Sequence, residues 1–353
     1  AIMSGKAPDL VKLGSPFEHV LARFGVLEPL DGLISEELKE QLLPSVLTAS
    51  FYRSITPKDM TGKLISIPYF TDTRAILYRK DIFQERDVPE PIGWTWSEFV
   101  TYAKQLTFDR DGDGKIDVYG FGTAANYTYQ AVMYAWQAGG ELMGADDRPA
   151  FTTDEFNEGI QFYADLFNVH KVVQPGAINV DLWDVRRQLA EGTVAMYIDA
   201  GDSAKELQKI LGDTLGVGLL PTNEKTGKFT SYFGSDALVI PKQSRNKAEA
   251  VKLLEWLVDK DRMTEYCIVS GFLPARLDSA ADPHFSDSPV VSMYLRQLED
   301  AHAWIAHPEA NFIARTLRVE IQNAISENSD IPAALKTAQE LVEKQLKDKG
   351  FLK

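Results

Sequence analysis

Residues 64–78 read LISIPYFTDTRAILY, and this stretch decides the fold class. Leu64–Tyr69 is an apolar run that contains Pro68, which predicts a strand ending at a crossover. A polar interval follows, and then the apolar run Ala75–Tyr78 predicts the next strand. Two strands joined in this way suggest that the chain passes from one sheet to another near Asp72.

Helices and strands alternate on both sides of this stretch. Thr95 with Glu98 forms a capping box, and Thr152 with Glu155 repeats that device before a second apolar helical face. Strands alternating with helices predict parallel α/β sheets. The same criteria predict strands over residues 10–13, 193–198, 216–220 and 237–240, and helices over 17–24 and 247–258, the last capped by Asn246.

Length and composition bound the function class. A chain of 353 residues suits two lobes better than one. Its net charge of −14 repels nucleic acid and anionic lipid. A single cysteine, Cys267, excludes an internal disulfide framework, and its apolar neighbours predict a buried thiol. No apolar run approaches the roughly 18 residues of a membrane span, and the sequence contains no signal-peptide pattern.

A series of short motifs runs along the chain in a distinctive order. They are GKAPDL at residues 5–10, GVLEPL at 25–30, GK at 62–63 ahead of IP at 67–68, YRKDIF at 78–83, WTWSEF at 94–99, GG at 139–140, GTVAM at 192–196 and GFLPA at 271–275. In this order and spacing they resemble the sugar-type extracellular solute-binding proteins of ABC importers, the maltose-binding-protein-like family. The resemblance covers essentially the whole chain.

The resemblance implies a periplasmic-binding-protein-like fold, with two α/β lobes joined by crossover strands and a cleft between them. We expect residues 1–72 and 236–285 in the N-terminal lobe, and residues 73–235 and 286–353 in the C-terminal lobe. Family members carry a first strand and helix ahead of the segment that matches residues 5–10. This sequence starts just before that segment, so we expect either that it is part of a longer chain or that its N-terminal lobe is built without this unit.

The resemblance also implies a function. We expect a non-enzymatic substrate-binding subunit that closes two lobes around a sugar or oligosaccharide and delivers it to a membrane permease. The expected location is extracytoplasmic, in the periplasm or lipid-anchored at the cell surface, although the sequence carries no export signal. We expect a monomer, no nucleic-acid partner and no catalytic cofactor.

Sugar recognition needs planar polar groups for hydroxyls and aromatic rings for C–H faces. If Pro68 and Tyr78 are aligned with their family counterparts, Asp72 takes the place of a sugar-binding acid. Asp199 and Asp202 follow a predicted strand, where the family's second lobe presents a loop to the cleft; alternatively, Asp202 or Ser203 caps the next helix. The remaining candidate ligand contacts are Ser15, Tyr69, Phe70, Tyr127, Tyr129, Tyr232, Phe233, Asp236 and Arg276.

Residues 109–117 read DRDGDGKID and reproduce most of a calcium-binding loop. Acids occupy positions 1, 3, 5 and 9 of the loop pattern, and glycine occupies position 6. Position 12, which normally holds a bidentate glutamate, is Gly120. We expect a structural Ca²⁺, or else an acidic surface turn. The predicted ligands are Asp109, Asp111, Asp113, the Lys115 carbonyl and Asp117.

Two other functions compete with the sugar-binding hypothesis. A cleft bearing several aspartates could hold a cationic amine such as a polyamine, since an ammonium favours charge and an aromatic cage. Paired acids such as Asp72 and Asp199 could also serve a glycoside hydrolase. The sequence contains no serine-hydrolase elbow, phosphate-binding loop or zinc-protease motif, which leaves the enzyme class weakly supported.

Overall fold

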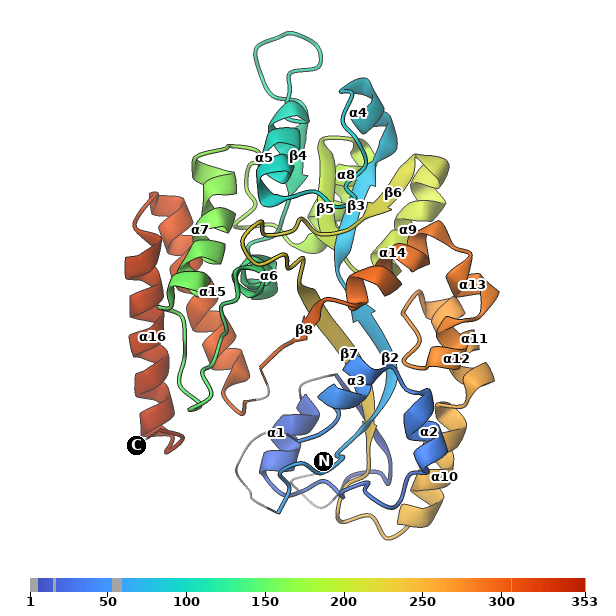
Figure 1. Ribbon diagram of the computed structural model, residues 1–353. Helices are drawn as coiled ribbons and strands as arrows, with labels where there is room; N and C mark the ends of the chain where they lie inside the picture. Colours follow the sequence, from blue (N-terminus) through green and yellow to red (C-terminus); the bar gives the residue numbers. More distant parts are fainter. Residues whose placement is uncertain (1–5, 15–16, 53–58, 306, 353) are drawn as a thin grey trace. The chain divides into compact units, whose positions relative to one another are not determined.

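A computed structural model describes residues 6–14, 17–52, 59–305 and 307–352. The chain forms two compact units (Figure 1). Unit 1 comprises Ala1–Thr73, Phe233–Glu299 and Ala303–Pro308, and unit 2 comprises Arg74–Tyr232, Asp300–His302 and Glu309–Lys353. The chain therefore crosses from one unit to the other several times, and one crossing falls between Thr73 and Arg74, inside the stretch that predicted it.

Unit 1 contains a sheet in the order β1-β7-β2, to which β8 adds beside β7. Both β1 and β2 pair antiparallel to β7. The core lies where Leu21 and Ala22 of α1 pack with Tyr52, Ile65 and Val239. Its elements are β1 (Val11–Gly14), α1 (Phe17–Arg23), α2 (Glu36–Gln41), α3 (Pro44–Ala49), β2 (Ile67–Thr73), α10 (Lys247–Leu257), α11 (Lys260–Ser270), α12 (Leu277–Ala280), α13 (Pro283–Ser286) and α14 (Pro289–Leu298). Two strands have residues in both units: β7 (Ser231–Val239), which is in unit 2 up to Tyr232, and β8 (Ala301–Ala303), which is in unit 2 up to His302.

Unit 2 contains a sheet in the order β4-β5-β3-β6. Every residue of β5 is buried, as expected for a strand covered on both faces. On one face Phe99 of α5 packs edge-on against Phe121 of β4. The elements are β3 (Ala75–Arg79), α4 (Lys80–Glu85), α5 (Trp96–Gln105), β4 (Tyr119–Gly122), α6 (Thr128–Ala138), α7 (Asp154–Asn168), α8 (Leu182–Glu191), β5 (Val194–Asp199), α9 (Gly201–Leu211), η2 (Gly212–Thr214), β6 (Leu215–Gly218), α15 (Ala310–Glu327) and α16 (Ile331–Asp348).

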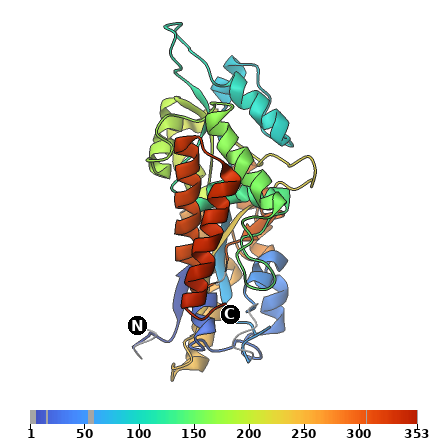
Figure 2. The same cartoon turned by 90° about the vertical axis from the view of Figure 1, so that its left-hand side faces the viewer.

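The last two helices of the chain belong to unit 2. Figure 2 shows α15 and α16 side by side in red, and both helices also contact α7. α16 starts at a cap in which Asp330 accepts a hydrogen bond from the Ala333 amide, with proline in the first turn. In the described part of the chain, no helix is both long and apolar enough to cross a membrane.

Several local predictions need correction. The sheets are not purely parallel: among the named strands of the described residues, β4 and β5 pair in parallel, whereas β3 pairs antiparallel with both β5 and β6. Thr153, not Thr152, caps α7, because the Thr152 hydroxyl instead bonds Gln339. Asn246 occupies the N-cap position of α10 but makes no side-chain cap; its side-chain amide instead donates to Asp9. Residues 286–299, expected in the C-terminal lobe, cluster with unit 1.

Candidate ligand-binding site

One edge of the unit 2 sheet gathers several candidate residues. β4 and β5 are parallel neighbours, so their carboxyl ends meet at this edge, and α6 and α9 begin beyond it. β3 runs antiparallel to β5 with Ala75 opposite Asp199, which places Arg74 at the same edge. Ligands of α/β proteins bind at the carboxyl ends of the strands. This edge is therefore the candidate site of unit 2.

Arg74, Tyr129 and Tyr232 form a compact group at this edge, which we call the arginine–tyrosine cluster. The Arg74 Cζ atom lies 5.3 Å from the Tyr129 ring centroid and 5.0 Å from that of Tyr232. The two rings are stacked with their centroids 5.0 Å apart. Burial raises the pKa of Tyr129 to about 12, so its hydroxyl remains protonated at neutral pH. Tyr127 adds a third ring, 5.8 Å from Tyr129.

Asp199 ends β5 and is almost fully buried. Its carboxylate accepts hydrogen bonds from the Ser203 hydroxyl at 2.6 Å, the Ala200 amide at 2.8 Å and the Tyr197 hydroxyl at 3.2 Å. Arg186 of α8 also faces it at 3.5 Å and bonds Ser203 and Glu206. With these partners, Asp199 holds the turn into α9.

Asp202 lies in the first turn of α9, three residues farther along the chain. Burial raises the pKa of this carboxyl, and the charge of Asp199 raises it further. Arg186 and Arg74 lower the same pKa, so both guanidinium groups interact electrostatically with Asp202. A carboxylate held where the ionised form is disfavoured is typical of a functional site.

Unit 1 carries a second group, the lysine–aromatic cluster, made of Lys12, Asp236 and four rings. Lys12 of β1 forms an ion pair with Asp236 of β7, which raises the pKa of the lysine. The Lys12 Nζ atom also lies 5.3 Å from the Phe70 ring centroid. The ring contacts, between centroids, are Phe70 to Phe272 at 4.2 Å, Tyr69 to Tyr266 at 4.8 Å and Phe70 to Tyr266 at 5.4 Å.

Asp72 and Phe233 were also predicted as ligand contacts, and neither belongs to one of the two clusters. Asp72 lies on β2 opposite Gly234, and its side chain is partly exposed. Phe233 is buried opposite Thr73 and belongs to the sheet core. Ser15 lies outside the described residues.

Arg276 belongs to neither cluster. Its guanidinium donates two hydrogen bonds to Asp278, at 2.8 and 2.7 Å, and a third to the Val258 carbonyl at 3.1 Å. It lines a surface pocket of about 400 Å³, together with Ser35, Glu37, Leu38, Gln41, Glu255, Asp259 and Asp278.

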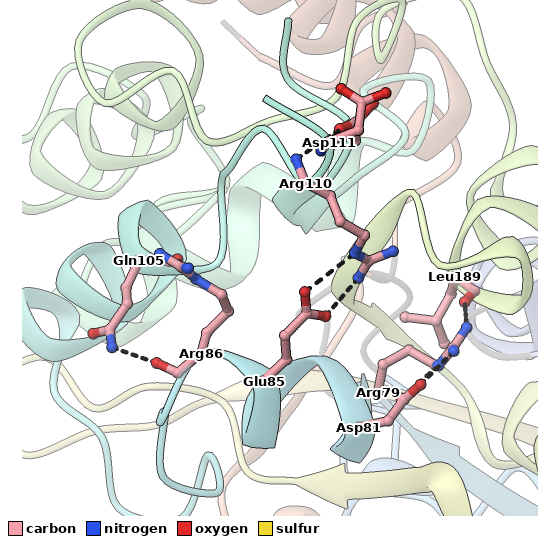
Figure 3. Close-up of polar contacts among 9 residues, drawn as sticks. Arg79, Asp81, Glu85, Arg86, Gln105, Arg110, Asp111 and Leu189 are labelled. Atoms are coloured by element: carbon pink, nitrogen blue, oxygen red, sulfur yellow. Dashed lines mark hydrogen bonds and ion pairs between the residues drawn. The ribbon is translucent and has the colours of Figure 1, made fainter. Parts of the chain in front are cut away.

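The acidic loop brings three of its four aspartates together. One carboxylate oxygen from each of Asp109, Asp111 and Asp117 lies within 4.8 Å of the others. Asp113 instead accepts from the Lys115 amide and ammonium group. Figure 3 shows Arg110 directed away from the acids, toward Glu85, with an N–O distance of 2.9 Å.

The Asp109 carboxylate is also bonded within the loop. It accepts from the Gly112 and Gly114 amides, each at 2.7 Å, and the Gly114 bond is the main cause of its lowered pKa. Glycine suits both positions, since each has a positive φ, 81° at Gly112 and 89° at Gly114. The donor set is that of a Ca²⁺ site, and calcium binding stays a prediction.

Sequence reasoning found most of the rings and acids but missed their cationic partners. Arg74 and Lys12 each meet a predicted ring or acid from a distant part of the chain, and Arg186 meets Asp199 from the preceding helix. Tyr266 and Phe272 were missed for the same reason. For Arg74 a local signal did exist, because it lies two residues from Asp72 in the stretch that marks the crossover.

Comparisons with known proteins agree with this architecture. The family model described as bacterial extracellular solute-binding protein matches residues 1–263. A binding protein of Brucella abortus is 25% identical over 304 residues, which are 85% of this chain and 70% of that protein.

Two solved solute-binding proteins of ABC transporters match along nearly the whole chain. That of Thermotoga lettingae, bound to α-D-tagatose, is 26% identical with a TM-score of 0.79, covering 98% of this chain and 86% of its own. That of Agrobacterium vitis, bound to D-mannitol, is 25% identical with a TM-score of 0.75, covering 99% and 87%. The fold is therefore periplasmic-binding-protein-like, and the chain belongs to the bacterial extracellular solute-binding protein family.

Proposed function

We propose that this chain is the substrate-binding subunit of an ABC importer and that it binds a neutral sugar or sugar alcohol of about six carbons. It acts outside the cytoplasm as a monomer and delivers the ligand to a membrane permease. The relatives bound to tagatose and mannitol support both the ligand class and the role in transport. Their role as transporter subunits also argues against an enzymatic function.

The observation that carries the proposal is that the candidate acids already lie next to cationic side chains. Asp236 is paired with Lys12, Asp199 is paired with Arg186, and Asp202 interacts with Arg74. A polyamine site needs unbalanced negative charge, because each ammonium must find a carboxylate. Acids that already have cationic partners, beside stacked rings, instead suit hydroxyl groups, which donate and accept hydrogen bonds, and sugar C–H faces, which pack on rings.

The test is a binding titration by intrinsic tryptophan fluorescence and calorimetry. The ligands are D-tagatose, D-mannitol, maltose and spermidine, and a nitrophenyl glycoside tests for turnover. We expect saturable binding of tagatose or mannitol, no binding of spermidine and no glycoside cleavage. Saturable binding of spermidine alone, or turnover of the glycoside, would overturn the proposal.

A pair of matched variants links binding to the lysine–aromatic cluster. Asp236→Asn removes the partner of Lys12 and should lower sugar affinity at least tenfold, about 1.4 kcal/mol. Asp261→Asn changes an exposed acid of α11 outside the cluster and should leave affinity unchanged. If Asp236→Asn and Asp261→Asn bind the sugar with equal affinity, Asp236 is not part of the binding site.

A further inference from the structure

We infer that Arg186 positions the turn from β5 into α9 for ligand binding, and that the exposed ring of Trp183 reports the state of this turn. The inference rests on the proposed sugar-binding function. It deepens that function by assigning a positioning residue that lies on α8, outside the turn itself. Trp183, Arg186 and the turn all belong to unit 2.

The start of α9 lacks an ordinary helix cap. Its N-cap residue is Ala200, which has no side-chain acceptor for the free amides of the first turn. The Asp199 carboxylate bonds the turn instead, because it accepts from the Ala200 amide at 2.8 Å and from the Ser203 hydroxyl at 2.6 Å. The conformation of the turn therefore depends on Asp199 and on the groups that hold Asp199 in place.

Arg186 of α8 contacts this turn at three points. One guanidinium nitrogen, Nη2, lies 3.5 Å from the Asp199 carboxylate and donates to the Ser203 hydroxyl. The other, Nη1, donates to Glu206 one turn farther along α9. The arginine side chain is only 12% exposed, so water competes little for these bonds. A single planar group therefore fixes the end of β5 and two successive turns of α9, and the candidate acid Asp202 lies between these points.

Trp183 contacts the same guanidinium. It lies one turn earlier on α8, and the Arg186 Cζ atom is 4.2 Å from its ring centroid, which is a cation–π distance. Trp183 is 63% exposed, so most of the residue faces water rather than the core. The emission of an exposed indole depends on the charge and the solvent beside its ring. A shift of Arg186 that accompanies ligand binding should therefore change the fluorescence of Trp183.

The arrangement requires arginine rather than any cation. A lysine at position 186 would keep a positive charge beside Asp199 and Glu206. Its ammonium is a single point charge, however, and cannot bond both turns of α9 while it stacks on Trp183. Charge compensation, which supports the fold, can therefore be separated from positioning, which supports binding.

The experiment compares wild type with Arg186→Met, Arg186→Lys and Ser203→Ala. Arg187→Met is the matched control, because Arg187 is the next residue of α8, is exposed and pairs only within that helix, with Asp184 and Glu191. Calorimetry gives the Kd for D-mannitol and D-tagatose. Circular dichroism and the melting temperature show which variants are folded.

We expect Arg186→Met to lower both the melting temperature and the affinity, the latter at least tenfold. Arg186→Lys should regain most of the melting temperature and still bind at least tenfold more weakly than wild type. A purely structural role would not give this result, because binding would then recover together with the fold. Ser203→Ala should lose at least threefold in affinity, and it replaces the arginine variants if neither of them folds. Arg187→Met should bind as wild type does.

Fluorescence tests the role of Trp183. Trp183→Phe should reduce the ligand-induced change in emission at least twofold. Trp256→Phe is the matched control, because Trp256 is also exposed and lies under an arginine, with the Arg262 Cζ atom 5.0 Å from its ring, but belongs to unit 1. It should keep the wild-type change. Arg186→Lys at saturating ligand should also show a reduced change, although it retains Trp183.

Two results would overturn the inference while the proposed function stands. Wild-type affinity in folded Arg186→Lys, or in Ser203→Ala where neither arginine variant folds, would show that Arg186 does not position the turn. An undiminished fluorescence change in Trp183→Phe would show that this ring is not the reporter. If wild type binds neither sugar nor polyol, the proposed function itself fails and the inference fails with it.

Discussion

Replacing Gly159 of α7 by alanine should destabilise unit 2 through a clash that no rotamer can relieve. A Cβ atom at this position would lie 2.3 Å from the Ala135 Cα and N atoms of α6 and 2.4 Å from the Tyr134 carbonyl carbon. Non-bonded carbon atoms prefer about 3.5–4.0 Å, so α6 and α7 must separate by about 1 Å. All three close atoms belong to the backbone, and the helices themselves must therefore move.

The expected cost follows from two opposing effects. Overpacking of a well-filled core costs about 1–3 kcal/mol, and alanine regains up to about 1 kcal/mol of helix propensity. A net loss of about 2 kcal/mol corresponds to a fall in melting temperature of roughly 4–8 °C for a body of this size. Scanning calorimetry measures it.

Two further variants test whether the backbone clash is the cause of the lost stability. Gln161→Ala changes an exposed residue of the same helix and should alter stability by less than about 0.5 kcal/mol. Adding Ala135→Gly to Gly159→Ala should not restore stability, because the clash is with the Ala135 backbone. A Gly159→Ala protein that melts at the wild-type temperature, or a full rescue by Ala135→Gly, would refute the reasoning.

Three other predictions concern α5, the acidic loop and acid stability. Thr95→Ala removes the reciprocal capping box with Glu98, so urea unfolding should show a loss of about 1 kcal/mol that Thr95→Ser largely avoids. Calcium should raise the melting temperature and a chelator should lower it, and Asp109→Asn should abolish both effects. If the wild-type melting curve does not respond to calcium, the prediction of a calcium site is wrong. Arg276 lowers the pKa of Asp278, so this pair adds stability above the unfolded pKa near 3.8 that is lost as pH falls through the folded value. Arg276→Met should therefore melt lower than wild type at pH 7, and the gap should narrow as pH falls through the folded value, to the part that comes from the lost Val258 hydrogen bond; a gap that does not change with pH would contradict the pairing.

Local signals in the sequence predicted many element boundaries. The capping box at Thr95 is present, and Gly139 and Gly192 end α6 and α8 in the left-handed conformation. Signals of this kind depend on residues within one helical turn. Where two neighbouring residues offer the same hydroxyl, as Thr152 and Thr153 do, the pattern cannot choose between them, because the choice depends on Gln339 of α16.

Strand pairing was harder to predict, because a buried strand records only that both its faces are covered. Apart from their last residues, Arg79 and Asp199, the β3 and β5 sequences are apolar, and nothing in either run indicates direction. Their antiparallel register joins Ala75 to Asp199 across more than a hundred residues. Alternation of helices and strands suggested parallel pairing, but the crossover at Arg74 brings β3 into the sheet in the opposite sense.

The roles of single acids at the candidate site were equally hard to predict from the sequence. Asp199 and Asp202 lie three residues apart, and the sequence made both candidate ligand contacts, with Asp202 as an alternative helix cap. Asp199 is enclosed by three hydrogen-bond donors and Arg186, so its side chain is bonded within the fold itself. Asp202 has its pKa raised by burial beside Asp199, so its ionised form costs folding free energy. Of the two acids, Asp202 at the candidate edge is therefore the stronger candidate for a ligand contact.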